Sequence, residues 1–222
     1  MENTQLETPK EANDRDKDMN TNPDELGPFH VEGHIKIFDP ESGHVYIDKR
    51  NAIHYENMSL ALAESLSNSG QGFIYMMAFG NGGTNVDPTG IITYLTPNTV
   101  GTNSTLYNQT YKKVVDKSSS ANTDSTRNKV EIRHLTGTTY SDLIVSCLLD
   151  YGEPADQEAF DNANSIDNAY TFDELGLKSY NPDVTDGEGK LLTHVIFHPV
   201  QKSLNRLIQI DYTVRIQSLS GV

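Results

Sequence analysis

The stretch that decides the fold class runs from Ile208 to Ile216 and reads Ile-Gln-Ile-Asp-Tyr-Thr-Val-Arg-Ile. Apolar and polar side chains alternate at every position. Because successive side chains of a β-strand point to opposite faces of the sheet, this alternation predicts a strand with one buried and one solvated face. The preceding run from Leu191 to Val200 is more continuously apolar, which is typical of a central strand.

Further strand candidates are spread over the chain from residue 29 onward, separated by turns rich in Gly, Asn, Asp and Pro. They are the hairpin at 33–48 and the runs at 73–79, 91–95, 106–115, 130–135 and 140–149. One helix is predicted at 58–66, where Met58, Leu62 and Leu66 recur every four residues, with Asn57 as its N-cap and its end at 68–70. Many short strands with one helix predict a mainly β domain, either a sandwich or a jelly-roll-like fold.

Charge divides the 222-residue chain into distinct parts. Residues 1–28 carry eight acidic and three basic side chains, and residues 150–189 carry eleven acidic and one basic, while the rest is nearly neutral. We therefore expect residues 1–28 to form an extended acidic N-terminal arm that is flexible unless bound to a neighbour. Residues 29–222 are expected to form a β-rich domain with an acidic loop insertion at about 150–189.

Composition also limits the kinds of partner that we expect. A net charge of −14 repels nucleic-acid phosphates, so we expect no nucleic-acid partner. No apolar run approaches the roughly 20 residues of a membrane-spanning helix, and the first residues lack the layout of a secretory signal, so we expect no membrane partner. The single cysteine, Cys147, excludes an internal disulfide framework and lies in an apolar run, which favours a buried side chain over a nucleophile.

Histidines and carboxylates offer two candidate metal sites. His30, Glu32 and His34 lie on one side of the first strand, and two imidazoles with a carboxylate could bind zinc in a metal-dependent hydrolase. Nothing nearby supplies a fourth ligand, so a solvated polar face is the favoured interpretation. His194 and His198 share a strand, but Pro199 indicates an edge or a bulge there.

Two glycine-containing turns invite ligand interpretations that their sequences do not support. The turn at 183–189 lacks the oxygen ligands of an EF-hand loop, so an exposed turn is favoured over a cation site. The turn Gly80-Asn-Gly-Gly-Thr84 lacks the Lys-Ser/Thr of a phosphate-binding loop, and we expect its glycines to adopt positive φ in a tight turn. We predict no catalytic residue, metal or cofactor.

Apolar residues in the acidic segments are the candidate partner contacts. Phe160, Tyr170 and Phe172 lie in the segment at 150–189, and Leu6 and Met19 lie in the arm. Aromatic side chains in a loop need a surface to pack against, which is either a partner or the body of the protein itself. We predict that these five residues contact partners, and burial against the body is the alternative.

The order of segments resembles that of virion structural proteins of tailed bacteriophages. The resemblance rests on a hairpin leading to Asp48-Lys-Arg-Asn-Ala-Ile53, a Leu/Ala helix, Phe73-Ile-Tyr-Met-Met-Ala-Phe-Gly-Asn-Gly-Gly-Thr84 and Leu106-Tyr-Asn-Gln-Thr-Tyr111. The ending, residues 192–203 followed by 208–216, is similar as well. These motifs are structural and span most of residues 31–217.

The resemblance implies a non-enzymatic structural subunit of the tail, neck or baseplate. Its expected partners are other virion proteins and copies of itself, as a homo-oligomer within a particle assembled in the cytoplasm of the host bacterium. Two alternatives stay open: a capsid decoration or cementing protein, and a carbohydrate-binding module that recognises the host surface.

Overall fold

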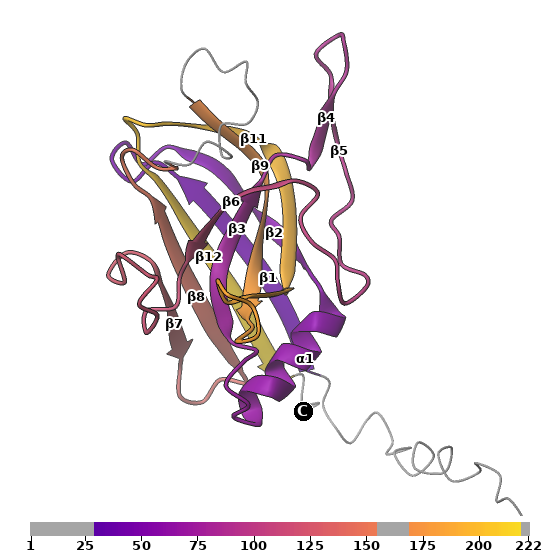
Figure 1. Cartoon of the computed structure of the whole chain (residues 1–222), viewed down its shortest axis with the longest axis vertical. Helices are drawn as coiled ribbons and strands as arrows, with labels where there is room; N and C mark the ends of the chain where they lie inside the picture. The colour runs from indigo at the N-terminus through magenta and orange to yellow at the C-terminus, as the bar shows by residue number, and fades with distance from the viewer. Residues whose placement is uncertain (1–28, 155–168, 219–222) are drawn as a thin grey trace, which may run out of the picture.

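The computed structural model describes residues 29–154 and 169–218, and it is mainly β (Figure 1). Strands account for 52% and helix for 7% of these residues. The elements, in chain order, are β1 Phe29–Phe38, β2 Val45–Ile53, α1 Tyr55–Leu66, β3 Ile74–Gly80, β4 Thr84–Val86, β5 Ile92–Tyr94, β6 Gln109–Val114, β7 Lys129–His134, β8 Tyr140–Leu149, β9 Ala169–Tyr180, β10 Glu188–Leu191, β11 Thr193–Ser203 and β12 Ile208–Ser218.

Ten of the strands form one antiparallel sheet, in the order β6-β3-β9-β11-β2-β1-β12-β8-β7, with β10 paired to β9. The sheet has two halves, which we call the β9 half (β6, β3, β9, β10, β11) and the β12 half (β2, β1, β12, β8, β7). They join through only two residue pairs, Thr193 with Ile53 and His194 with Ala52. This short junction is the corner at which the sheet curls. The strands β4 and β5 form a separate two-stranded hairpin.

The core lies between the inner faces of the two halves. Ile208, Ile210, Tyr212 and Val214 of β12 are all fully buried, as their alternation predicts. They share one hydrophobic cluster with residues of the β9 half, including Phe172. The prediction of a mainly β domain with one short helix is confirmed, and a single curled sheet provides both layers of the sandwich.

The helix α1 begins three residues earlier than its apolar spacing predicts. His54 is the N-cap, and its Nδ1 accepts a hydrogen bond from the Asn57 backbone N–H at 3.2 Å. Asn57 is therefore not the cap: it is buried, and its Nδ2 donates to the Leu191 carbonyl at 2.9 Å. Met58 packs against the core, as expected.

The prediction of one loop across 150–189 is wrong for most of its second half. Residues 169–180 form β9, which lies between β3 and β11 in the sheet, and residues 188–191 form β10. The acidic pair Asp173 and Glu174 interrupts the apolar pattern and makes this strand look like a loop. Because both faces of β9 are covered, however, its polar residues are buried along with its apolar ones.

Tyr170 and Phe172 are consequently core residues, and their prediction as partner contacts is wrong. Both are fully buried. The Phe172 ring lies edge-on to Phe79 at 5.5 Å and to Phe197 at 5.8 Å, which is the alternative of burial against the body. The other predicted contacts, Leu6, Met19 and Phe160, lie outside the described residues, as does the N-terminal arm.

Candidate functional site

A buried carboxylate at the middle of β9 holds two loops together. Glu174 is fully buried and accepts four hydrogen bonds. Its Oε1 accepts from the backbone N–H groups of Gly82 at 3.1 Å and Asn108 at 2.8 Å, and its Oε2 accepts from the Tyr107 N–H at 2.9 Å and from His194 Nε2 at 2.9 Å. Burial by itself would raise the pKa of Glu174, but these hydrogen bonds outweigh it and hold the pKa below its ordinary value.

The neighbouring carboxylate, Asp173, holds the base of the β4–β5 hairpin. It accepts from the Gly83 N–H at 2.9 Å and the Thr84 N–H at 3.0 Å, and it also accepts from the Thr84 hydroxyl. Here burial is the dominant influence and raises the pKa of Asp173, and the hydrogen bonds oppose it only in part. Both carboxylates therefore serve as acceptors for backbone groups that would otherwise be buried without partners.

The backbone N–H groups of the turn at residues 80–84 bind two carboxylates of the protein itself, those of Asp173 and Glu174. The prediction that its glycines adopt positive φ is wrong, because Gly80, Gly82 and Gly83 are absent from the positive-φ residues of the described chain. Close packing requires them instead. A Cβ on Gly80 would lie 2.4 Å from Glu174 Oε1, and one on Gly82 would lie 2.8 Å from the Asn108 nitrogen.

Two buried histidines hold the loop between β5 and β6. His194 Nδ1 accepts from the Asn98 N–H at 2.7 Å, so its Nε2 carries the proton that it donates to Glu174. His54 Nδ1 likewise accepts from the helix, so its Nε2 donates to the Gly101 carbonyl at 3.0 Å. Both rings have both nitrogens bonded, which makes them positioning groups for the loop.

The sequence-based pairing of His194 with His198 does not form a site. His198 is exposed and lies 3.3 Å from the Tyr94 hydroxyl, whereas His194 is enclosed. The pairing of β11 with β9 shifts register between Ile196 and Val200, so the bulge that Pro199 predicts is present. Beyond Thr193 and His194, β11 has no ladder partner on its β2 side within the described residues, so the strand is also an edge at Pro199.

The hairpin fixed by these groups stands away from the body of the protein (Figure 1). Its side chains Val86, Ile91 and Tyr94 are 62%, 61% and 53% exposed. Asp87, its only charged residue, accepts from the Thr89 and Ile91 N–H groups within the turn. The result is a rigidly anchored projection that presents apolar side chains to solvent.

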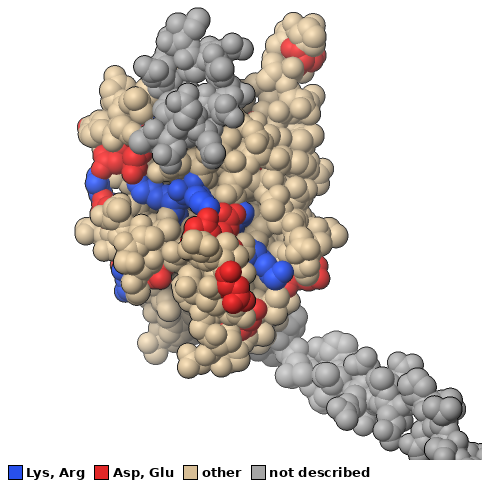
Figure 2. Space-filling view, in the orientation of Figure 1, with Lys and Arg blue, Asp and Glu red and all other residues tan. Residues whose placement is uncertain are grey.

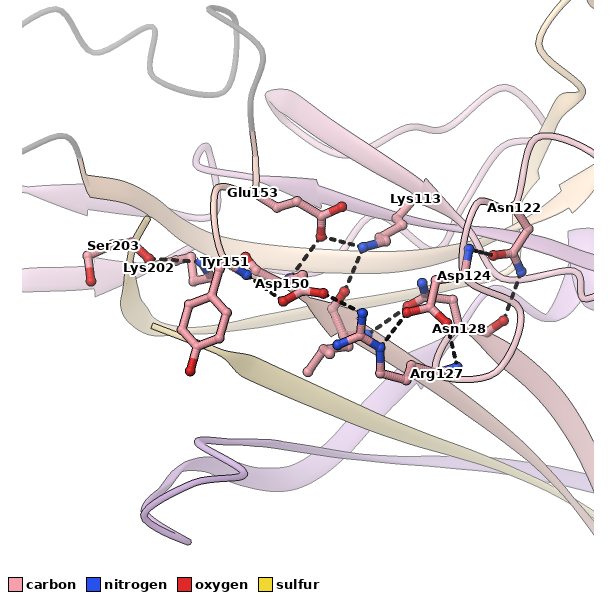
Figure 3. Close-up of polar contacts among 11 residues, drawn as sticks. Lys113, Asn122, Asp124, Arg127, Asn128, Asp150, Tyr151, Glu153, Lys202 and Ser203 are labelled. Carbon is pink, nitrogen blue, oxygen red and sulfur yellow. Dashed lines mark hydrogen bonds and ion pairs between the residues drawn. The ribbon is translucent and has the colours of Figure 1, made fainter. Parts of the chain in front are cut away.

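A second polar network connects β6, at one end of the sheet, to β8 and to the loops beside it (Figure 3). Lys113 of β6 donates to the Leu148 carbonyl of β8 at 2.7 Å and pairs with Glu153. Arg127 pairs with Asp124 and Asp150. These side chains, which we call the seam, close the sheet where no backbone ladder connects β6 to β8.

Lys202 and Cys147 are buried near the seam. Lys202 Nζ donates to the backbone carbonyls of Asp150 at 3.0 Å and Ser203 at 2.8 Å, and burial lowers the pKa of Lys202 to about 8. Burial raises the pKa of Cys147 to about 12, which leaves it a thiol at neutral pH. The expected buried state of Cys147 is confirmed.

Four of the seven described acidic residues of 150–189 are paired with lysines or arginines. Figure 2 shows basic and acidic side chains next to each other across one face of the body. Lys112 pairs with Asp186 and Glu188, and Lys178 also pairs with Glu188. Two of the three carboxylates of the 183–189 turn, Asp186 and Glu188, are thus paired with ammonium groups.

The candidate zinc residues occupy the outer face of β1. His34 Nε2 lies 2.8 Å from an Asp48 oxygen, and Glu32 lies 4.0 Å from Arg50. Within residues 29–154 and 169–218, no three His, Cys, Asp or Glu side chains are arranged to hold a metal ion. His30 and His34 are exposed on this face.

A groove of about 730 Å³ lies between α1 and the β12 half. Met58 and Leu62 line it from the helix, and Val130, Leu143 and Ile216 line it from β7, β8 and β12. Sequence reasoning missed this groove and the seam, because both depend on which strands are neighbours. In the part of the chain that the structure describes, no helix is long and apolar enough to cross a membrane.

No family model, curated protein or solved structure matches the chain. The resemblance to phage virion proteins therefore stays a prediction from the sequence.

Proposed function

We propose that this protein is a non-enzymatic structural subunit of a tailed-phage virion that forms interfaces with other subunits. The observation that carries the proposal is the projecting hairpin. It exposes Val86, Ile91 and Tyr94, while Asp173 and Glu174 hold its base with buried hydrogen bonds. A rigid element that presents apolar side chains loses little entropy on binding, which suits a permanent protein interface.

The buried ionisable side chains that could take part in catalysis already make structural contacts. Glu174 and His194 bond to each other and to loop backbone, and Lys202 bonds to two carbonyls. This use of the ionisable groups supports a structural role over a catalytic one. The placement in a tail, neck or baseplate, in a particle assembled in the bacterial cytoplasm, follows from the sequence resemblance.

Quantitative peptide mass spectrometry on purified phage particles tests the proposal, with the main shell subunit as the reference. A low copy number, at a small multiple of the tail's rotational symmetry, supports a tail, neck or baseplate subunit. Near-stoichiometric abundance would instead identify a capsid decoration protein. Absence from the particle would overturn the virion proposal.

A hairpin variant tests whether this element makes the interface. Val86→Asp combined with Ile91→Asp should abolish incorporation into particles and leave the melting temperature of the isolated protein unchanged. Asn85→Asp combined with Thr93→Asp is the control with the same number of added charges, because these two residues pair with each other on the face opposite Val86. Normal incorporation of the double variant would remove the hairpin from the interface.

A second candidate, carbohydrate binding, is favoured by one observation. A mixed polar groove of about 840 Å³ is lined by Phe73, Tyr75 and Tyr180, together with Lys112 and Asp116. Phe73 stacks on Tyr180 at 5.1 Å, and aromatic faces beside polar groups are a common arrangement for binding sugar rings. Binding on a glycan array that Tyr180→Ala abolishes would support this function, and an array without binding would exclude it.

A further inference from the structure

The strand at the end of the sheet, β7, has one unpaired edge. It pairs with β8 from Lys129 to His134, and within residues 29–154 and 169–218 no other strand pairs with it. Ile132 at its centre is 76% exposed, and Leu135 just beyond it is 56% exposed. A free edge with exposed apolar side chains is a template for pairing with another strand.

The apolar side of β7 continues into the groove beside α1. Val130 and Ile132 line that groove together with Leu143 and Ile216. Val130 packs against the core, and Ile132 extends the same face toward the open edge. A strand added to β7 would therefore place its own apolar residues next to an existing apolar surface.

The charges of β7 select its partner. Glu131 and Arg133 flank Ile132 and lie on the opposite face from it. In an antiparallel pair of β7 strands related by a two-fold axis at Ile132, each Glu131 faces the Arg133 of the other copy. The two Ile132 side chains then face each other, and opposite charges directly across a strand pair are stabilising.

Neighbouring registers lose this complementarity. An axis at Glu131 sets Lys129 opposite Arg133, and an axis at Arg133 sets that residue opposite its own copy, so like charges meet in both cases. Glu131 already lies 3.0 Å from Lys129 of its own strand, and Arg133 lies opposite Asp142 in the β7–β8 register, where the Asp142 carboxylate pairs with Arg215. The dimer would add a second cation to Glu131 and leave these contacts in place.

We propose that two copies of this chain pair through their β7 strands about a two-fold axis at Ile132. The pairing extends the sheet across both copies and brings their apolar grooves together. This interface deepens the proposed function, on which it rests, by naming how one subunit contacts a copy of itself.

A charge exchange tests the pairing by sedimentation equilibrium of the full chain. The wild type should dimerise, and Glu131→Arg and Arg133→Glu should each weaken self-association about tenfold or more, because like charges then face each other twice. An equimolar mixture of the two variants should restore dimers, since every facing pair is again of opposite charge. Urea unfolding of each variant checks that the fold is intact.

Cysteine crosslinking gives a second measurement. Ile132→Cys should crosslink under mild oxidation, because residues facing each other across antiparallel strands have Cα atoms about 4.5–5.5 Å apart. Leu135→Cys is the control: it is also exposed but lies three residues from the axis, so it should not crosslink. The native Cys147 is buried and should not compete.

Three outcomes would overturn the interface. The first is a wild type that stays monomeric up to millimolar concentration. The second is dimerisation of the Glu131→Arg or Arg133→Glu variant as strong as that of the wild type. The third is an equimolar mixture of the two variants that does not form dimers. Loss of dimers on deletion of residues 1–28, with no effect of the charge variants, would assign the contact to the arm instead. None of these results bears on whether the protein is found in particles, so the proposed function is tested separately.

Discussion

Replacing Glu174 by Gln tests whether this buried carboxylate holds the two loops. The variant keeps the size and shape of the side chain and changes one oxygen to an NH₂ group. Each carboxylate oxygen now accepts from two donors: Oε1 from Gly82 and Asn108, and Oε2 from Tyr107 and His194. Whichever way the amide turns, its NH₂ group faces two donors that lose their acceptor.

The expected cost follows from those two donors. A buried donor without a partner costs about 1–3 kcal/mol, so Glu174→Gln should lower the free energy of unfolding by about 2–6 kcal/mol. The effect should depend on pH. Because the pKa of Glu174 in the folded protein lies below its ordinary value of 4.5, its stabilising contribution is present above that pH and is lost as pH falls through the lowered pKa.

Urea unfolding at pH 7 and pH 4 measures both effects, and amide hydrogen exchange at Gly82, Tyr107 and Asn108 locates them. The difference between wild type and variant should be smaller at pH 4. Glu56→Gln is the control, because Glu56 is exposed in the first turn of α1. A loss below about 1 kcal/mol at pH 7, or unchanged exchange at these three amides, would refute the assignment of Glu174 as the anchor of the loops.

Three other tests probe separate parts of the fold. Gly80→Ala should destabilise by about 1–3 kcal/mol and more than Gly83→Ala, because the added Cβ meets its nearest atom at 2.4 Å instead of 3.0 Å; the reverse order in urea unfolding would contradict the close-packing argument. Phe172→Ala should cost about 3–5 kcal/mol and Ile132→Ala below about 0.5 kcal/mol; equal losses would contradict their burial. Lys202→Met should remove a rise in stability between pH 8 and pH 10.5, since burial lowers the pKa of Lys202 to about 8 and the folded state releases its proton first; parallel pH profiles for both proteins would contradict this.

Local periodicity explains which expectations were confirmed. The alternation in Ile208 to Ile216 and the hairpin at 33–48 predict strands because a strand exposes every second side chain, whichever strands become its neighbours. The strand at 169–180 was not predicted, because the prediction relied on this local alternation. Asp173 and Glu174 break the alternation, and only their burial between β3 and β11 shows that the segment is a central strand.

The candidate site depends on contacts that periodicity does not encode. The backbone donors that Glu174 binds lie 66, 67 and 92 residues away from it. The glycines at 80–83 are visible in the sequence. Glycine is required there because these carboxylates approach the backbone closely, and not because the chain makes a tight turn. The position of Phe172 also depends on the tertiary structure. An aromatic residue in an acidic segment must be covered, but the sequence does not say whether a partner or the body of the protein covers it.

The sequence by itself determined that this chain is mainly β, with one short helix and with most of its strands, β9 excepted, in nearly the observed places, because strand and helix patterns are local. The tertiary structure alone decided the order of the strands, the seam that closes the curled sheet and the open edge at β7. It also decided that buried acids and histidines anchor an exposed hairpin. The physical reason is that a charged group can be buried only where distant parts of the chain supply its hydrogen-bond partners.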